Sequence, residues 1–214
     1  LRSLEMCEKF EAGYLVLHMG SVPMKPKKWT KKLTSLLGEG RQHDKAFLKH
    51  KVAFVRKREK VAPLYYQRAL EALESLAERA QELGVKLAVE SRSRYEDVPS
   101  EREMLQLQQH FADHPAIGYW HDFGHVQLKH NLGLLDHQQW LESVSRHLVG
   151  CHLHDVQWPA RDHRVPFQGS IDYVPLLKHI PAELPLVWEL SPTRKAHDIR
   201  ESLKEWRKRH PDHG

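Results

Sequence analysis

Short apolar runs alternate with longer amphipathic stretches along this chain, and each pattern predicts one kind of element. The apolar runs have the length of strands that are buried on both faces of a sheet. The predicted strands are residues 13–21, 85–91, 117–122, 148–155 and 184–190. Because predicted helices separate them, the pattern indicates an α/β fold with a parallel sheet.

The longest amphipathic stretch carries a clear helical pattern. Between residues 63 and 84, Leu70, Leu73 and Ala77 fall at helical spacing. Gly84 then occupies the place of a C-terminal cap, where a left-handed backbone is common. These signals predict a helix over residues 63–84.

The remaining helices are predicted from their first residues. Ser100 followed by Glu103 is a capping box, in which the two side chains satisfy backbone N–H groups reciprocally. Asp136 and Gln139 form the same kind of cap, and Asp172 begins a short helix. A charged helix is predicted at the end of the chain.

One polar residue stands at the end of each of four predicted strands, namely Glu90, Asp122, His152 and Glu189. They are 32, 30 and 37 residues apart, which is about one strand–helix unit each time. In a closed α/β barrel the C-terminal ends of all strands meet on one face, where such enzymes have their active sites. We therefore expect these four side chains to form one cluster.

Two glutamates, one aspartate and one histidine are typical of a divalent-cation site. Three crowded carboxylates would repel one another without a cation, and burying one of them unpaired is costly. Oxygen ligands with one imidazole suit Mn, Mg, Co or Zn rather than copper or an iron–sulfur cluster. His125, in the stretch YWHDFGH, is interpreted as a residue that orients a ligand, a substrate contact or an additional ligand.

Positive charge is concentrated in one segment. The whole chain has a net charge of +5, whereas residues 25–60 contain 13 Lys or Arg against three acidic residues, a local charge of +10. We interpret residues 22–60 as a basic, irregular insertion. It is either a solvated surface or a flap over an anionic substrate or a nucleic-acid backbone.

The bulk composition is that of one globular domain. A length of 214 residues, 40% apolar content and a mean hydropathy of -0.63 fit a soluble protein, and no run approaches the ~18 apolar residues of a membrane span. Cys7 and Cys151 form no CxxC pair, so a cytoplasmic protein without disulfides is expected. The sequence begins without Met, and we expect it to belong to a longer chain.

Five stretches, in order, resemble the xylose-isomerase-like TIM-barrel superfamily: LAVES, YWHDFGH, CHLHD, DHRVPFQGSID and LVWEL. This superfamily contains sugar isomerases and epimerases, and also zinc-dependent type-IV apurinic-site endonucleases. The resemblance runs from about residue 12 to 205. It implies a (β/α)8 TIM barrel, present here as one domain over residues 1–214 that holds strands four to eight and lacks the first three βα units.

Carried over residue by residue, the resemblance places the central metal site on the four strand-end residues. His18 matches a histidine that binds a second zinc in the endonucleases, His125 matches the histidine of a D-x-x-H motif, and His163 precedes a Gly-x-Gly-Ile-Asp turn. Two positions depart from the pattern. Arg161 replaces an endonuclease aspartate and Phe167 replaces the first glycine of the turn, and both departures argue against a third metal ion.

The expected protein is an enzyme of carbohydrate metabolism, a divalent-metal-dependent isomerase or epimerase acting on a small sugar or sugar derivative. One Mn, Co, Mg or Zn ion would stabilise an enediolate. Glu90 and Glu189 would be the catalytic residues that move the proton. His18, His125 and His163 would bind substrate or additional zinc ions.

The alternative is a zinc-dependent phosphodiesterase similar to the apurinic-site endonucleases, with a nucleic acid as its partner. His18 and the basic segment favour it, while Arg161 and the lack of an aromatic and basic wedge argue against it. A non-catalytic carbohydrate-binding protein is the third interpretation, which the intact donor set disfavours. The leading interpretation predicts a small carbohydrate partner, anionic if the basic segment contacts it, and no membrane. A homo-oligomer would cover open sheet edges.

Overall fold

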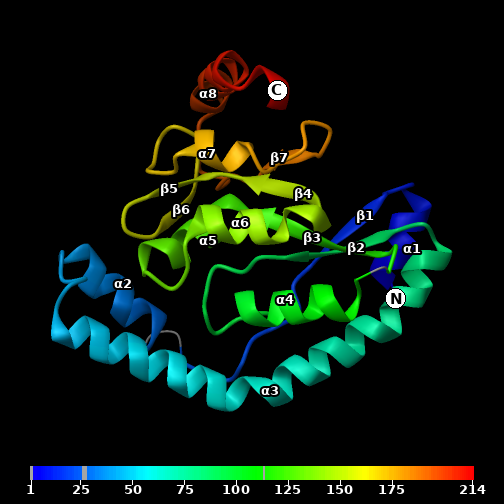
Figure 1. Ribbon diagram of the computed structural model, residues 1–214. Helices are drawn as coiled ribbons and strands as arrows, with labels where there is room; N and C mark the ends of the chain where they lie inside the picture. Colours follow the sequence, from blue (N-terminus) through cyan, green and yellow to red (C-terminus); the bar gives the residue numbers. More distant parts are fainter. Residues whose placement is uncertain (1, 26–27, 113) are drawn as a thin grey trace.

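The computed structural model describes residues 2–25, 28–112 and 114–214. Five parallel strands form one sheet in the order β1-β2-β3-β4-β7, which is half of an α/β barrel (Figure 1). The strands are β1 (Tyr14–Leu17), β2 (Lys86–Glu90), β3 (Ile117–Asp122), β4 (Leu148–Leu153) and β7 (Leu186–Trp188). Among the described residues, β1 and β7 each pair with a neighbour along one edge only. The half-barrel confirms the predicted fold and its five strands.

Helices follow the strands and cover the outer face of the half-barrel (Figure 1). The helices are α1 (Arg2–Lys9), α2 (Thr30–Gly38), α3 (Lys45–Glu82), α4 (Glu101–His110), α5 (Phe123–Asn131), α6 (His137–Val144), α7 (Tyr173–Leu177) and α8 (Ala196–Arg209). Two short 3-10 turns, η1 (Ser145–His147) and η2 (Pro211–His213), and a small hairpin of β5 (Asp155–Gln157) and β6 (Arg161–Arg164) complete the fold. No helix within the described ranges combines the length and apolarity needed to cross a bilayer.

The central strands are apolar on both faces because helices and the barrel interior bury both. Leu87, Ala88 and Val89 of β2 are fully buried, as are Tyr119 and Trp120 of β3. Parallel strands that are covered on both faces have this continuous apolar pattern. The strand ends, where the polar residues stand, are therefore fixed by the core.

The predicted caps begin the predicted helices. Ser100 accepts from the backbone N–H of Glu103, and the Glu103 side chain accepts from the N–H of Ser100, so the capping box is confirmed. Asp136 accepts from the N–H of Gln139 at the start of α6, and Asp172 begins α7. The caps at Ser100 and Asp136 thus fix the first residues of α4 and α6.

The prediction for the basic segment was wrong in one respect, because residues 22–60 are not irregular. The segment contains α2 and the first part of α3, which begins at Lys45 and runs for 38 residues with Pro63 inside it. Residues 26 and 27 of the segment lie outside the described residues. Proline lacks an N–H and clashes with the preceding turn, so Pro63 predicts the start of a helix. Tertiary packing overrides this signal, and α3 bends below the sheet (Figure 1).

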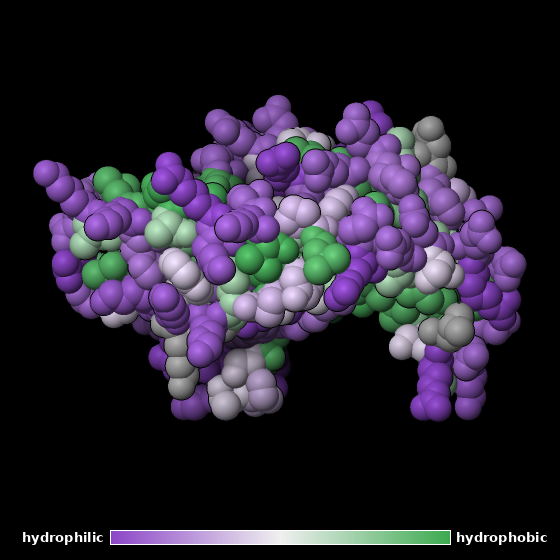
Figure 2. Space-filling model, turned by 90° about the horizontal axis from the view of Figure 1, so that it is seen from below, coloured by the Kyte–Doolittle hydropathy of each residue, from purple (hydrophilic) through white to green (hydrophobic). Residues whose placement is uncertain are grey.

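A small second hydrophobic core stabilises the part of α3 that precedes Pro63. Phe47 and Phe54 of α3 lie against Leu33, Leu36 and Leu37 of α2, and all five are buried. The outer face on the α3 side is largely hydrophilic, with scattered hydrophobic residues (Figure 2). The helices of the basic segment thus form an amphipathic layer that packs onto the half-barrel.

Candidate functional site

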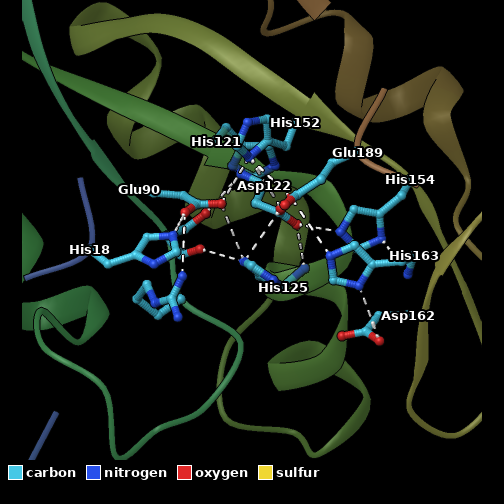
Figure 3. Close-up of polar contacts among 12 residues, drawn as sticks. His18, Glu90, His121, Asp122, His125, His152, His154, Asp162, His163 and Glu189 are labelled. Carbon is cyan, nitrogen blue, oxygen red and sulfur yellow. Dashed lines mark hydrogen bonds and ion pairs between the residues drawn. The ribbon is translucent and has the colours of Figure 1, made fainter. Parts of the chain in front are cut away.

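The four strand-end residues meet at the C-terminal edge of the sheet (Figure 3). Glu90 ends β2, Asp122 ends β3, His152 lies in β4 and Glu189 follows β7. One ligand atom from each lies within 4.8 Å of the ligand atoms of the others. The register explains the convergence, since Asp122 and His152 are paired positions on neighbouring strands.

His152 occupies the centre of this cluster. Its Nδ1 lies 2.9 Å from Glu90 Oε1 and 3.3 Å from Glu189 Oε2. The distance from the same nitrogen to Asp122 Oδ2 is 3.7 Å. Three carboxylates therefore surround one imidazole nitrogen, and each presents an oxygen to the same small volume.

Two of these oxygens have no hydrogen-bond partner. Asp122 Oδ2 and Glu189 Oε2 are buried atoms that accept no hydrogen bond from the described residues. The Asp122 side chain is 0% exposed and that of Glu90 is 1% exposed. Buried polar atoms are almost always satisfied in proteins, so unpartnered carboxylate oxygens that face one another fit a divalent cation. Oxygen donors with one imidazole are a suitable ligand set for it.

Asp122 both caps a helix and belongs to the cluster of carboxylates. Its Oδ1 accepts from the backbone N–H of His125 at 2.7 Å and so caps α5, which begins at Phe123. Its Oδ2 faces the other carboxylates. The cap and the candidate ligand are two oxygens of one side chain, which explains why an acid ends this buried strand.

The three remaining predicted histidines also reach the cluster (Figure 3). His18, just after β1, contacts Glu90 Oε2 through Nε2. His125 Nδ1 lies 3.0 Å from the backbone oxygen of Ser91 and 3.4 Å from Asp122 Oδ2. His163, in β6, places Nε2 at 3.6 Å from Glu189 Oε2.

Carboxylates surround the imidazoles of His152 and His163, whereas burial lowers the pKa of His125. The nearby carboxylates of Asp162 and Glu189 raise the pKa of His163 to about 10. Burial opposes charge on His152, but Glu90 and the other carboxylates outweigh it and raise its pKa. Neighbouring anions favour the charged form of an imidazole. The same field favours a bound cation.

Three residues that contribute to the site were not predicted, namely Ser91, His154 and Asp162. The Ser91 hydroxyl accepts from the backbone N–H of Asp122 at 2.9 Å, and Asp162 Oδ1 lies 3.3 Å from His163 Nδ1. His154 is fully buried and lies beside Asp122. A signal for His154 exists, because it follows His152 by two residues in CHLHD and alternate strand residues share a face.

The two departures from the resemblance have structural consequences. Phe167, where the related turn has glycine, adopts a left-handed backbone with φ 68, a conformation that favours glycine. The turn that follows is held by Asp155, whose carboxylate accepts from the N–H groups of Gly169 and Ile171. Arg161 lies on the exposed side of β6.

A cavity of about 370 Å3 lies next to the centre. The residues that line it include Lys31 of α2, Arg94 of the loop after β2, and Leu128 of α5. Asp162 lines it as well and contacts His163, so the cavity adjoins the cluster. Arg92 contacts Glu90 at 3.4 Å, whereas Trp120 is fully buried and lies edge-on to His152.

A sequence model of the xylose isomerase-like TIM barrel family matches residues 1–209. No curated protein matches the chain. Among solved structures, a D-tagatose 3-epimerase-like protein is similar at 15% identity and a TM-score of 0.65, with 96% of this chain and 65% of that chain covered. An IOLI protein with a bound zinc atom shares 17% identity at a TM-score of 0.57, covering 97% of this chain and 64% of that chain.

A third similar structure is a 3-keto-D-glucoside 4-epimerase from E. coli, at 20% identity and a TM-score of 0.55, with 67% of this chain and 54% of that chain covered. The chain thus spans less than two thirds of the length of each of these three structures. At 15 to 20% identity the likeness shows a shared fold.

Proposed function

The chain belongs to the xylose isomerase-like TIM barrel family, and from this premise we propose that it is a divalent-metal-dependent isomerase or epimerase of a small sugar or sugar derivative. The observation that carries the proposal is the convergence of four ligand atoms within 4.8 Å, two of which are unpartnered buried carboxylate oxygens. The sugar epimerases among the similar structures support the choice of reaction.

Glu90, Asp122, His152 and Glu189 would hold the cation. When bound, it would polarise the substrate carbonyl oxygen and stabilise the negative charge that develops there. Mn, Co, Mg and Zn all suit this ligand set, and the zinc-bound IOLI structure supports zinc as the first ion to test.

Glu90 and Glu189 are proposed as the proton-transfer residues. Their oxygens approach His152 Nδ1 at 2.9 and 3.3 Å, so they flank the centre. The Glu189 side chain is 44% exposed and can reach a substrate directly. Each carboxylate has two oxygens, and one can take up the α-proton while the other remains in the cluster. Return of the proton to the neighbouring carbon gives an isomerase, and to the opposite face an epimerase.

The substrate would extend from the centre into the adjoining cavity. Lys31 and Arg94 supply positive charge there, and Leu128 supplies an apolar wall. His163, held between Asp162 and Glu189, and His125 would contact substrate hydroxyls. This arrangement favours a small carbohydrate, and an anionic group on it would complement Lys31.

The proposal is tested by metal content per chain, measured by elemental mass spectrometry on the full-length protein. We expect one divalent ion in the wild type and none in Asp122→Asn. Asp136→Asn is the matched control, since Asp136 caps a helix in the same way but lies outside the cluster. Exchange of a substrate C–H proton in D2O, followed by NMR over a panel of neutral and phosphorylated ketoses, then tests the reaction.

The same measurements decide the alternative. His18 in contact with Glu90 is the observation that favours a phosphodiesterase with more than one zinc. Two or three zinc ions per chain together with cleavage of abasic DNA would replace the isomerase by that activity. Absence of bound metal in metal-replete wild type would refute both.

A further inference from the structure

We propose that His154 is a positioning residue, which holds Asp122 so that only Oδ2 of its carboxylate faces the metal centre. The inference rests on the proposed metal centre and adds a residue to it. His154 is fully buried, and its Nε2 lies 3.0 Å from Asp122 Oδ1.

The two oxygens of Asp122 have different surroundings. Oδ1 accepts from the backbone N–H of His125 at 2.7 Å and has His154 Nε2 as its second polar neighbour. Oδ2 has no hydrogen-bond partner among the described residues and lies 3.7 Å from His152 Nδ1. A carboxylate whose Oδ1 accepts from a backbone N–H and lies against a fully buried ring cannot rotate freely, so Oδ2 is presented to the centre.

The tautomer of His154 follows from its other nitrogen. The backbone N–H of His163 donates to His154 Nδ1 at 2.9 Å, a shorter contact than the 3.5 Å from the same nitrogen to the backbone oxygen of Asp155, so Nδ1 carries a lone pair. A neutral imidazole with an accepting Nδ1 has its proton on Nε2, the atom that faces Asp122 Oδ1. His154 Nε2 makes no hydrogen bond within the described residues, so its N–H is left to face Asp122 Oδ1 at 3.0 Å. His154 is therefore an electrostatic neighbour of the carboxylate rather than a metal ligand.

The backbone at two neighbouring positions leaves space for the ring of His154. A Cβ at Gly124 would lie 1.9 Å from His154 Cε1, so only glycine fits at that position. His163 adopts a left-handed backbone with φ 51, and its ring stacks on that of His154 at 4.2 Å with an interplanar angle of 10°. A non-glycine residue in this conformation is strained. Both features cost stability in isolation and both serve to place His154.

The same atoms do not form a second metal site, although His125, His154 and His163 offer nitrogens within 4.8 Å of one another. Imidazole lone pairs lie in the ring plane, and the planes of His154 and His163 are nearly parallel. Two parallel lone pairs cannot converge on one ion at the ~2.0–2.1 Å that zinc–nitrogen bonds require. His154 Nδ1 is in addition already occupied by the N–H of His163.

The test is the zinc affinity of the full-length protein, measured by competition with a chromophoric chelator, together with the unfolding midpoint of the metal-free form. In His154→Leu we expect zinc to bind 10–100-fold more weakly, as is usual when an outer-shell partner is lost. His154→Gln keeps an N–H donor near the Nε2 position and should bind within a few-fold of wild type. Recovery by glutamine but not leucine distinguishes positioning from simple core packing.

His137→Leu is the matched control, since His137 is a buried histidine that contacts His121 and Gln127 rather than a proposed ligand. It should lower the unfolding midpoint while zinc affinity stays at the wild-type value. If His154→Leu does not fold, Gly124→Ala displaces the same ring and should also weaken zinc.

Wild-type zinc affinity in His154→Leu would overturn the inference while leaving the proposed metal centre intact. A second zinc ion that is lost with His154 would overturn it too, in favour of a three-histidine site. Failure of the wild type to bind zinc at all would refute the proposed function and this inference with it.

Discussion

Arg58 of α3 and Glu103 of α4 form a fully buried ion pair that joins the basic segment to the loop bearing the site. Arg58 Nη1 and Nη2 donate to the two oxygens of Glu103 at 2.5 and 2.6 Å. The guanidinium also donates to the backbone oxygens of Tyr95 and Asp97. Because residues 91–97 follow Glu90 directly, part of the basic charge stabilises the fold around the centre.

Removing one partner of this pair should destabilise the protein strongly. In Arg58→Met the Glu103 carboxylate stays buried without its cation, which costs about 3–5 kcal/mol of unfolding free energy. Urea unfolding measures the loss. Arg56→Met, on the exposed side of the same helix, is the control and should change the free energy by less than about 0.5 kcal/mol. Equal effects of the two substitutions would show that Arg58 is not a structural clamp.

The ion pair also illustrates what the sequence could and could not predict. Strand ends and caps were predicted because their signals are local, as at Ser100 and Glu103. The beginning of α3 was not, since Pro63 is a local signal for a helix start and the contacts of Phe47 and Phe54 that override it come from α2. No local pattern distinguishes Arg58 from the exposed basic residues around it.

In the candidate site, too, some features have a local sequence signal and others depend on tertiary contacts. Glu90, Asp122, His152 and Glu189 could be predicted as a cluster because parallel strands bring their ends together. Helix α5 begins directly at Phe123, after β3 without a loop, and this places the backbone N–H of His125 on Asp122. The role of His154 depends on a hydrogen bond from His163 across a hairpin, which spacing along the chain does not specify.

A chain of buried hydrogen bonds keeps two further histidines neutral. Trp140 Nε1 donates to the Tyr119 hydroxyl, which is thereby left to donate to His121 Nδ1. His121 Nε2 then donates to His137 Nε2, and His137 Nδ1 donates to Gln127. Burial lowers the pKa of His121 to about 3 and that of His137 well below its usual value.

This series of hydrogen bonds predicts that the folded protein loses stability in mild acid. Each ring binds a proton at its ordinary pKa of 6.5 when unfolded but stays neutral when folded, so stability is complete above pH 6.5 and falls as the pH drops toward 3. The expected slope is about 1.4 kcal/mol per pH unit for each ring. Urea unfolding at pH 7.5 and 5 measures it.

His121 and His137 together contribute to the slope of the unfolding free energy against pH. His137→Gln removes one of the two rings, so it should remove about half of that contribution. The exposed His43→Gln is the control and should leave the wild-type slope unchanged. A wild-type slope in His137→Gln would contradict the assignment of the acid sensitivity to these rings.

The left-handed backbone at Phe167 predicts an inverted order of stability for small substitutions. Phe167 stacks on His210 and lies edge-on to Tyr173, so both Phe167→Ala and Phe167→Gly should destabilise. Glycine adopts φ 68 without strain, and the glycine variant should be more stable than the alanine variant by about 1 kcal/mol. Thermal unfolding followed by circular dichroism measures both.

Leu105, exposed on α4, provides the matched comparison. In a helix interior the order is reversed, because glycine is about 1 kcal/mol less favourable than alanine. The same order at both positions would mean that the backbone at Phe167 is not left-handed in solution.

Chelation should destabilise the protein through the centre itself. Without a cation, the carboxylates of Glu90, Asp122 and Glu189 repel one another, and two of their oxygens remain unpartnered. Free zinc at 100 times its dissociation constant would add about 2.7 kcal/mol of stability by mass action. We expect EDTA to lower the unfolding midpoint of the wild type and zinc to restore it.

Burial opposes the charge of Asp122, but the imidazoles of His125 and His154 outweigh it and lower the pKa of this carboxyl. The neutral side chain of Asp122→Asn should therefore make the metal-free form less stable than metal-free wild type, and zinc should not raise its midpoint. Asp136→Asn keeps a side-chain oxygen at the helix cap, so it should change stability little and still respond to zinc as the wild type does. An unchanged response to zinc in Asp122→Asn would mean that the metal binds elsewhere.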